Sequence, residues 1–204
     1  MPAYFDECQK NFVKSCFEGA GMLVLRVVNE PTSAMIAYHL DGCKDGYFAV
    51  YDLGGGMFDS SVILSKKGVL KVISTRGDNA LGGDDFDNLI IDKIKENSQK
   101  CINCKNFRNH KTCKIANDLS FIAREIKHEI GRNAKVVKKI YLNGETSIFS
   151  LKKTEFVDIA SPLVEKTIQI LTDAVHDAAL RMTDLQGILL VGGATKMAVV
   201  KDAL

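Results

Sequence analysis

Apolar runs and glycine-rich turns alternate in the central part of the chain. The apolar run over residues 47–53 has Asp52 near its end and leads into Gly54–Gly56, and a second apolar run follows over residues 58–64. This pattern predicts a strand, a tight turn and a returning strand. Another alternating run predicts a third strand over residues 69–75. An ordinary hairpin with a flexible tip has the same pattern, so the hairpin alone does not define a site.

Hydrophobic residues at helical spacing predict the helices of the chain. The predicted helices cover residues 4–20, 31–38, 84–94, 116–130 and 154–182. Further apolar runs predict strands over residues 23–28, 136–142, 146–151 and 187–191, the last of them buried. Pro162 lies in the early part of the longest helix, where we expect it to bend the helix.

Two further glycine-rich turns follow strands. One spans residues 76–87 and opens onto a helix, and the other contains Gly192 and Gly193 after the last strand. Three such turns, separated by helices, indicate an α/β protein whose loops converge on one ligand. The chain contains neither the Gly-x-Gly-x-x-Gly spacing of dinucleotide-binding folds nor the Gly-x-x-x-x-Gly-Lys-Ser/Thr spacing of the P-loop.

The residues of the first turn suit a phosphate group. Glycine has no Cβ, so a turn made of Gly54, Gly55 and Gly56 can take positive φ and lets other groups approach its amides closely. Successive backbone N–H groups in such a turn form a concavity that binds anions. Asp52 is placed to hold Mg²⁺ through water, because Mg²⁺ keeps much of its hydration shell. Carboxylate, metal and glycine amides together predict a nucleotide phosphate site.

Composition narrows the class of protein. The 204 residues, 46% of them hydrophobic, suffice for one sizeable or two small globular domains. A net charge of +2, from 27 basic and 25 acidic residues, gives no bias toward nucleic acid. The sequence starts without a secretory signal, and no apolar run approaches the roughly 18 residues of a membrane span. Six cysteines in such a chain indicate reduced thiols, so we expect a soluble cytoplasmic protein without a membrane partner.

A cluster of cysteines allows two interpretations. Cys101, Cys104, His110 and Cys113 offer four soft ligands within thirteen residues, loosely similar to a zinc knuckle. However, no second Cys-x-x-Cys pair is present, and a cysteine-rich surface loop has the same composition. A zinc-organised module and a surface loop both remain open.

Four segments together resemble the signature segments of the 70-kDa heat-shock chaperone family. They are residues 29–32 (Asn-Glu-Pro-Thr), 50–59, 77–87 and 190–196, and they occur in the family's order across nearly the whole chain. Three details are more similar to the HscA branch, which serves iron–sulfur cluster assembly, than to the general chaperone DnaK. These are the turn over residues 65–68, the Gly-Gly-Asp-Asp-Phe variant at 82–86 and the Ala-Ser-Pro-Leu-Val stretch at 160–164.

The resemblance implies the actin-like, ribonuclease H-like ATPase fold, with ATP or ADP and Mg²⁺ held between two lobes. It implies that residues 1–42 are a remnant of lobe I with the crossing helix, that 43–80 and 155–204 form lobe IIA, and that 81–154 form the lobe IIB insertion. The chain would then be a truncated nucleotide-binding domain, mainly lobe II, without the family's first phosphate loop and the lysine near the γ-phosphate. ATP hydrolysis by this chain alone is therefore not expected.

The resemblance also assigns roles to individual residues. Glu30 matches a residue that senses the γ-phosphate, Asp52 matches the acid near the hydrated Mg²⁺, and Lys127 matches the lysine near the ribose. The second phosphate loop corresponds to Gly54, Gly55, Gly56 and Met57, and the adenosine-binding turn to Gly192, Gly193, Ala194, Thr195 and Lys196.

Several of these positions differ from the family's pattern. Met57 stands in place of threonine and has no hydroxyl to donate. Ala194 and Lys196 replace serine and arginine, and the lysine lacks the planar group that stacks on adenine. Beside Lys127, the residues often found in the family are replaced by Arg124, His128 and Gly131.

The resemblance extends to partners. In the family the intact protein works with unfolded client proteins and a J-domain co-chaperone, and in the HscA branch with an iron–sulfur scaffold protein. The alternative is a non-enzymatic remnant that binds nucleotide weakly or serves as an interaction module. Apolar residues over 4–38 would lose their packing in a truncated form, so we expect self-association through that surface.

Overall fold

A four-stranded sheet forms the centre of the molecule. The computed structural model describes residues 1–3, 5–39, 45–97, 114–142 and 145–204. The sheet has the order β3-β2-β1-β6, built from β1 (Gly46–Leu53), β2 (Phe58–Lys66), β3 (Val69–Asp78) and β6 (Leu185–Val191). The first three strands form an antiparallel meander, whereas β6 runs parallel to β1. Leu53 pairs with Phe58 across the glycine turn, so the predicted hairpin and third strand are confirmed.

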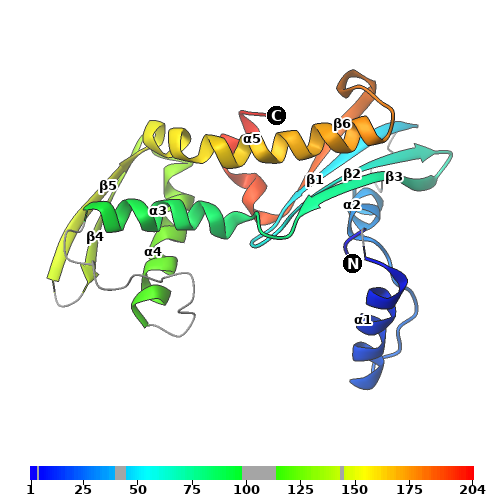
Figure 1. The fold of residues 1–204 in the computed structure, drawn as a ribbon, viewed down its shortest axis with the longest axis horizontal. Coiled ribbons are helices and arrows are strands. Elements are labelled where there is room, and N and C mark those ends of the chain that lie inside the picture. The colour runs from blue at the N-terminus through cyan, green and yellow to red at the C-terminus, as the bar shows by residue number, and fades with distance from the viewer. Residues whose placement is uncertain (4, 40–44, 98–113, 143–144) are drawn as a thin grey trace.

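Helices cover both faces of this sheet. Side chains alternate along β1, so that Tyr51 faces the larger core beneath α5 (Lys153–Asp177). Val50 points to the other face, where it packs with Met35 of α2 (Glu30–His39). The molecule therefore has three layers here, with α5 and α2 on opposite sides of the sheet (Figure 1).

Side-chain contacts join α5 to the sheet. Tyr51 donates to Thr167 Oγ1 at 2.6 Å, Ser74 donates to the Ala174 carbonyl at 2.6 Å, and ion pairs join Arg76 to Asp177 at 2.6 Å and Lys166 to Asp78 at 2.5 Å. All of the α5 residues in these contacts lie after Pro162. The expected bend at Pro162 stays a prediction.

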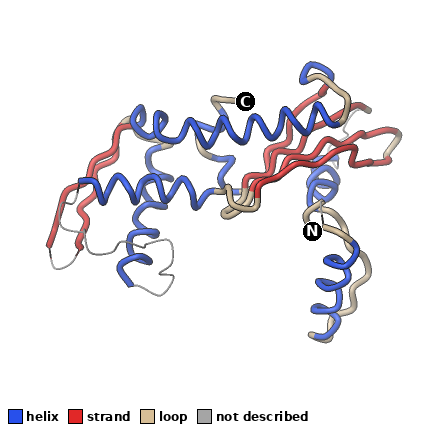
Figure 2. The backbone as a smooth tube through the Cα atoms, in the orientation of Figure 1, coloured by secondary structure: helices blue, strands red, loops and turns tan. Residues whose placement is uncertain are grey.

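A second group of elements lies at the other end of α5. It consists of α3 (Gly83–Asn97), α4 (Lys114–Ile130), β4 (Lys135–Leu142) and β5 (Glu145–Lys152). The last two form a separate antiparallel pair, at the far left of Figure 2, whose inner side chains are buried against the helices. The Asn143–Gly144 turn lies outside the described residues. The assignment of lobes to residue ranges stays a prediction.

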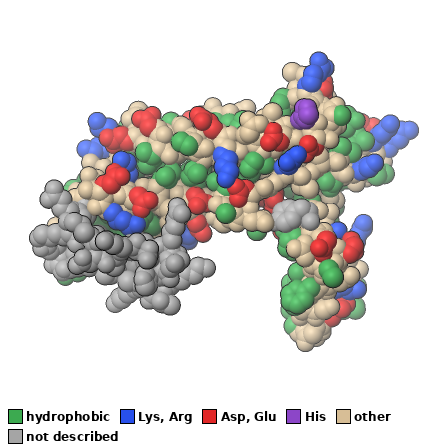
Figure 3. Space-filling model, in the orientation of Figure 1, with side chains coloured by type: hydrophobic (Ala, Val, Ile, Leu, Met, Phe, Trp, Pro, Cys, Tyr) green, Lys and Arg blue, Asp and Glu red, His purple; other side chains and the backbone are tan. Residues whose placement is uncertain are grey.

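The N-terminal segment projects from the body of the molecule. Asp6 caps α1 (Glu7–Gly19) by accepting a hydrogen bond from the Gln9 N–H at 2.8 Å, yet no residue of α1 is buried. The predicted strand over residues 23–28 is wrong, because this stretch has no regular secondary structure. A strand requires a pairing partner, and none lies beside it in the described part of the chain. Hydrophobic side chains consequently remain on the surface of this segment (Figure 3).

Two other elements differ from the prediction. The long helix ends at Asp177 rather than near Met182, because Ala179 takes a left-handed φ of +56° that closes it. A short 3₁₀ turn, η2 (Met182–Asp184), leads into β6 instead. The last strand is only half-buried, since β6 lies at an edge of the sheet. Two short helices, η3 (Gly193–Lys196) and α6 (Ala198–Lys201), complete the described chain.

None of the described helices combines the length and the apolar character that crossing a membrane requires.

Candidate functional site

The first two glycine-rich turns fit against each other through their backbones. The Gly83 N–H donates to the Gly54 carbonyl at 2.9 Å, and the Asp84 N–H donates to the Gly55 carbonyl at 2.7 Å. A Cβ on Gly82 would lie 2.4 Å from the Gly55 carbonyl oxygen, a separation that no side chain tolerates. Glycine is therefore required for this approach, and the N-terminus of α3 is fixed to the hairpin turn.

The third turn presses against the end of β1. Gly192 has φ +86°, and a Cβ there would lie 2.2 Å from the Leu53 carbonyl oxygen and 2.8 Å from Asp52 Oδ1. The Thr195 hydroxyl donates to the Gly192 carbonyl at 2.7 Å and closes the turn. Because β6 is parallel to β1, both strands end at the same edge of the sheet and bring their turns together.

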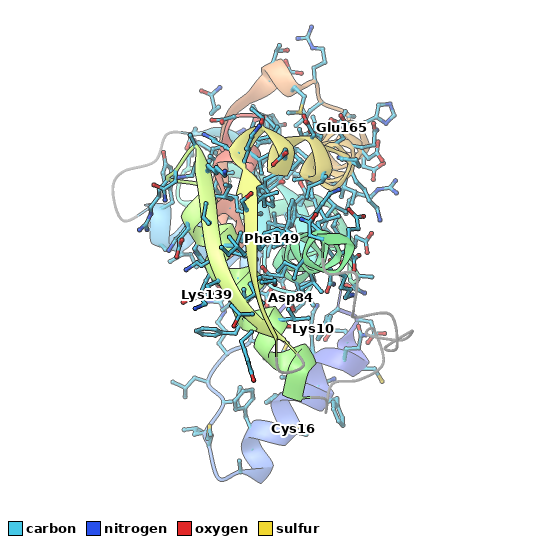
Figure 4. The ribbon with its side chains drawn as sticks, turned by 90° about the vertical axis from the view of Figure 1, so that its left-hand side faces the viewer. Lys10, Cys16, Asp84, Lys139, Phe149 and Glu165 are labelled. Carbon is cyan, nitrogen blue, oxygen red and sulfur yellow. The ribbon has the colours of Figure 1, made fainter. Side chains whose placement is uncertain are left out.

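One cavity lies where these turns meet. It has a volume of about 600 Å³, and it is bounded by the glycine turns, by one side of α4 and by the residues around α6. Of the predicted site residues it is lined by Gly54, Gly55, Lys127, Gly193, Ala194 and Lys196. Asp84, labelled in Figure 4, lies in the first turn of α3 and lines this cavity.

A buried ion pair fixes Lys127 in the wall of the cavity. The Lys127 ammonium lies 2.8 Å from Asp87 Oδ1 and donates to the Gly83 carbonyl at 2.7 Å. Both side chains are less than a tenth exposed. The contact with Asp87 is mainly electrostatic, because neither carboxylate oxygen accepts a well-aligned hydrogen bond from a described residue. Lys127 thus links α4 to the start of α3.

Asp87 was not among the residues predicted for the site. The sequence nevertheless indicated that this residue is unusual, because Asp87 lies one helical turn before Ile90 and Ile91 on the apolar, buried side of α3. A carboxylate at a buried helical position requires a partner. That partner, Lys127, comes from another helix and could not be read from local spacing.

The same wall carries further basic side chains. Arg124 lies 3.3 Å from Asp84 Oδ1 and 3.5 Å from Asp87 Oδ2. His128 of α4 and Arg132, which follows the end of α4, also line the cavity. Lys196 of η3 and Lys201 of α6 also line the cavity.

Three carboxylates gather in a separate small cleft. Glu30, Asp52 and Asp59 line it together. Burial raises the pKa of Asp52, and the charge of Glu30 adds to this effect. Burial likewise raises the pKa of Asp59 to about 6, with the charges of Glu30 and Asp52 contributing. Asp59 Oδ1 is buried and accepts no hydrogen bond from the described residues. Mutual repulsion and an unpartnered oxygen make this cleft attractive to a cation, but the three carboxylates are not placed to ligate one metal ion directly, so a cation would be held through water.

The remaining predicted residues line neither of these two hollows. Gly56 and Met57 are exposed at the tip of the hairpin turn. Gly192 and Thr195 are used in the turn itself, Thr195 being buried. The cysteine cluster, with Cys101, lies outside the described residues. Among all the described residues, those of the acidic cleft included, no three His, Cys, Asp or Glu side chains are grouped so that they could hold a metal ion directly.

The fold and the site define an α/β protein whose glycine-rich turns surround one cavity. The sequence model of the Hsp70 protein family matches residues 1–204, and the chain belongs to the Hsp70 family. Similar relatives are named chaperone protein HscA homologs: those of Methylobacillus flagellatus and Ralstonia nicotianae are 41% identical, and that of Methylococcus capsulatus is 38% identical. Each match covers 100% of this chain and 32% of the relative. The chain therefore spans about a third of the length of these relatives.

Proposed function

We propose that the chain is the nucleotide-binding part of an Hsp70-type chaperone and that its cavity binds ATP or ADP. Members of the Hsp70 family bind nucleotide, usually with Mg²⁺. The observation that carries the proposal is the meeting of three glycine-rich turns and Lys127 around one cavity. A volume of about 600 Å³ also lies within the range typical of small-molecule sites.

Each part of the cavity has a role in this proposal. The Gly54 N–H donates to the Met57 carbonyl at 3.0 Å and closes the turn, so the N–H of the exposed Gly55 binds the phosphates, because backbone N–H groups at such turns attract anions. Lys127 reaches the sugar from α4, and Asp87 holds its ammonium in place. The turn at Gly193 and Lys196 forms the base-binding side.

The acidic cleft is the proposed magnesium end of the site. Asp52 holds Mg²⁺ through water, and Glu30 senses the terminal phosphate from the same cleft. When bound, Mg²⁺ supplies positive charge that offsets the charge of the phosphates. The unpartnered Asp59 oxygen and the raised pKa values in this cleft support the assignment.

Binding without turnover is the activity proposed for this chain alone. Met57 is partly exposed at the tip of the phosphate turn, and its thioether donates no hydrogen bond. No described residue before β1 lines the cavity. Phosphoryl transfer depends on positioning, so we expect ATP turnover at the background level in a coupled assay. Sustained turnover by the purified chain would contradict this part of the proposal.

The names of the relatives suggest the wider role. We propose that the intact protein is an HscA-like chaperone in the cytoplasm, linked to iron–sulfur cluster assembly through a scaffold protein and assisted by a J-domain co-chaperone. Client binding would then belong to regions of the relatives that this chain does not match.

Calorimetric titration with ADP and Mg²⁺ tests the proposed site. The chain should bind one ADP, and Lys127→Met should weaken the affinity by roughly tenfold or more, because a charge-assisted contact is lost. Lys139→Met, on an exposed lysine that does not line the cavity, is the matched control and should bind normally. Thermal melts of each variant show whether a loss of binding reflects unfolding.

Two results would overturn the proposal. One is a chain that remains folded and binds no ADP. The other is a folded Lys127→Met variant that binds ADP as tightly as the unchanged chain.

A further inference from the structure

Helix α1 has one half-buried side and one free side. Within this helix only Lys10, Val13 and Lys14 are half-buried, and they lie three or four residues apart, on one face. The chain that returns from α1 toward α2 passes along this helix, and a groove between the two is lined by Lys10 and by residues 26–29 (Figure 1). The remaining residues of α1 are all exposed.

The free side of α1 carries an apolar stripe. Cys8, Phe12 and Cys16 are four residues apart, so they lie on one face of the helix. Phe12 is two residues from both Lys10 and Lys14, and two residues of an α-helix turn through about 200°, so the stripe points away from the half-buried side. Phe12 is 70% exposed, and both cysteines are exposed free thiols, of which Cys16 is labelled in Figure 4.

No charge on the helix opposes contact between two such stripes. The four charged side chains of α1 pair within the helix, Lys10 with Glu7 at 3.1 Å and Lys14 with Glu18 at 3.6 Å. The stripe itself is uncharged, so it does not select an acidic or a basic partner. The surface that suits it is neutral and apolar, and the same face of a second copy has this character.

The stripe is also symmetric about its middle residue. Cys8 and Cys16 each lie four residues from Phe12, in opposite directions along the chain. When two such helices pack antiparallel with their Phe12 side chains at the centre, Cys8 of one copy comes level with Cys16 of the other, and this happens twice. A twofold contact requires a patch that is complementary to itself, and this arrangement meets that requirement.

The distances between packed helices suit a disulfide at both places. Packed helix axes lie about 8–10 Å apart and Cα atoms about 2.3 Å from their axis, so facing Cα atoms are roughly 3.4–5.4 Å apart. A disulfide joins Cα atoms that are about 4.4–6.8 Å apart. Within one helix, a rise of about 12 Å separates Cys8 from Cys16, which is too far for a bond. A Cys8–Cys16 disulfide therefore joins two copies.

We propose that this face of α1 is a contact between two copies of the chain, in which the helices lie antiparallel and Cys8 of each copy faces Cys16 of the other. A contact between two helices of 13 residues belongs to the class below about 1,200 Å² that is typical of weak complexes. It is therefore reversible while the thiols are reduced. Oxidised glutathione makes it permanent: each Cys8–Cys16 pair forms one S–S bond, and its two protons and two electrons reduce the oxidant to two glutathione thiols.

Disulfide cross-linking of the whole chain tests this proposal. The chain is treated with oxidised glutathione, the remaining thiols are alkylated, and the dimer is separated without reductant and digested with trypsin. Trypsin cleaves after Lys10, Lys14 and Arg26, so Cys8 and Cys16 fall in different peptides, residues 1–10 and 15–26. Mass spectrometry should find these two peptides linked to each other about tenfold or more often than either is linked to itself, because only the mixed pair meets the Cα distance of a disulfide in an antiparallel contact.

Variants test the orientation and the contact separately. Neither Cys8→Ser alone nor Cys16→Ser alone can form the mixed pair, whereas an equal mixture of the two variants should form it. Phe12→Glu should lower the yield of the mixed pair about tenfold, because a charge in the middle of an apolar contact loses its hydration. Phe121→Glu, at a similarly exposed phenylalanine on α4, is the matched control and should cross-link normally. Thermal melts show whether each variant is folded.

Three results would overturn the inference. The first is a folded chain that forms no dimer in oxidised glutathione, which would leave the stripe to a different protein. The second is a dimer in which the self-linked peptides are as frequent as the mixed pair, since the helices would then have no fixed orientation. The third is a Phe12→Glu variant that cross-links as well as Phe121→Glu. None of these results bears on the cavity, which the ADP titration tests on its own.

Discussion

The position of Asp87 determines the position of Lys127. Its carboxylate lies between α3 and α4, buried, and Lys127 is the described cation nearest to it at 2.8 Å. Removing one partner of a buried pair leaves an uncompensated charge, which costs far more than the pair itself contributes. Asp87 is therefore a positioning residue that contacts the ammonium rather than the ligand.

Asp87→Asn should both destabilise the chain and weaken ADP binding. We expect the free energy of unfolding to fall by about 3 kcal/mol, because Lys127 is left buried without its counter-charge. Urea denaturation measures the first effect and calorimetry the second. Adding Lys127→Gln to Asp87→Asn should restore much of the stability but not the binding. Full ADP affinity in the folded Asp87→Asn variant would contradict the positioning role.

Asp59 gives the chain a pH-dependent stability. Its folded pKa of about 6 exceeds its ordinary value of 3.8, so the folded state holds the proton more tightly than the unfolded state. The contribution of protonated Asp59 to the unfolding free energy is fully present below about pH 4, and it is lost as the pH rises through about 6. Since Asp59 is only half-buried, we expect the unfolding free energy to fall by about 1 kcal/mol across this range.

Asp59→Asn isolates this contribution from other titrating groups. Urea denaturation at pH 4 and pH 7 gives the slope of the unfolding free energy against pH for each protein. The slope of the variant should lack the decrease that Asp59 causes. Equal slopes for the two proteins would show that Asp59 does not titrate in this range.

At the scale of the elements, the contact between the first two glycine turns holds α3 against the hairpin. Two backbone hydrogen bonds make this contact, and both need the close approach that Gly82 permits. A side chain at this position would push the turns apart and would move the start of α3, together with Asp87.

Gly82→Ala should therefore lower the unfolding free energy by about 2 kcal/mol or more, because its Cβ would lie 2.4 Å from the Gly55 carbonyl oxygen. Gly56→Ala is the matched control, since a Cβ there meets nothing within 4 Å, and it should change stability by less than about 1 kcal/mol. Thermal denaturation of both variants without nucleotide makes the comparison. A smaller effect at Gly82 than at Gly56 would show that the turns are not locked together.

Elements with strong local patterns were predicted well from the sequence. The meander, the paired strands β4 and β5 and the helices all follow from spacing within a single segment. The predicted strand over residues 23–28 failed because pairing depends on a neighbour that local spacing does not reveal. The prediction that β6 is buried was also wrong. Its place at the edge of the sheet is a property of the assembled fold, which the local sequence does not reveal.

The candidate site was predictable to a similar extent. The glycine turns were predicted from their own segments, whereas Lys127 was identified only through the family resemblance. Asp87, Asp59, Arg132 and Lys201 were missed, because their places at the two hollows arise from the packing of distant segments.

At the scale of the whole molecule, the N-terminal segment leaves a large apolar surface in water. The exposed hydrophobic side chains of this segment include Phe12 at 70%, Phe17 at 49%, Met22 at 55%, Leu23 at 84% and Leu25 at 87%. Contiguous apolar surface of this kind promotes association.

We therefore expect the chain to self-associate at micromolar concentration, as sedimentation velocity would show. Leu23→Glu combined with Leu25→Glu should shift the distribution to monomer, because both side chains are almost fully exposed. Val69→Glu, at an exposed position on β3, is the control and should not change the distribution. A monomeric unchanged chain would contradict the prediction.

The long helix α5 has a mechanical consequence. Its 25 residues extend about 37 Å, and its bonds to the sheet all lie in the half that follows Pro162. The half before Pro162 adjoins β5 and α3, near the wall that carries Lys127. Phe156 and Ala160 are buried in that half, so the two halves of α5 are anchored to two different groups of elements, and a movement of one group is passed along the helix to the other. Proline has no N–H to donate to the helical hydrogen-bond ladder, so we expect α5 to bend at Pro162 when the two groups of elements move relative to each other.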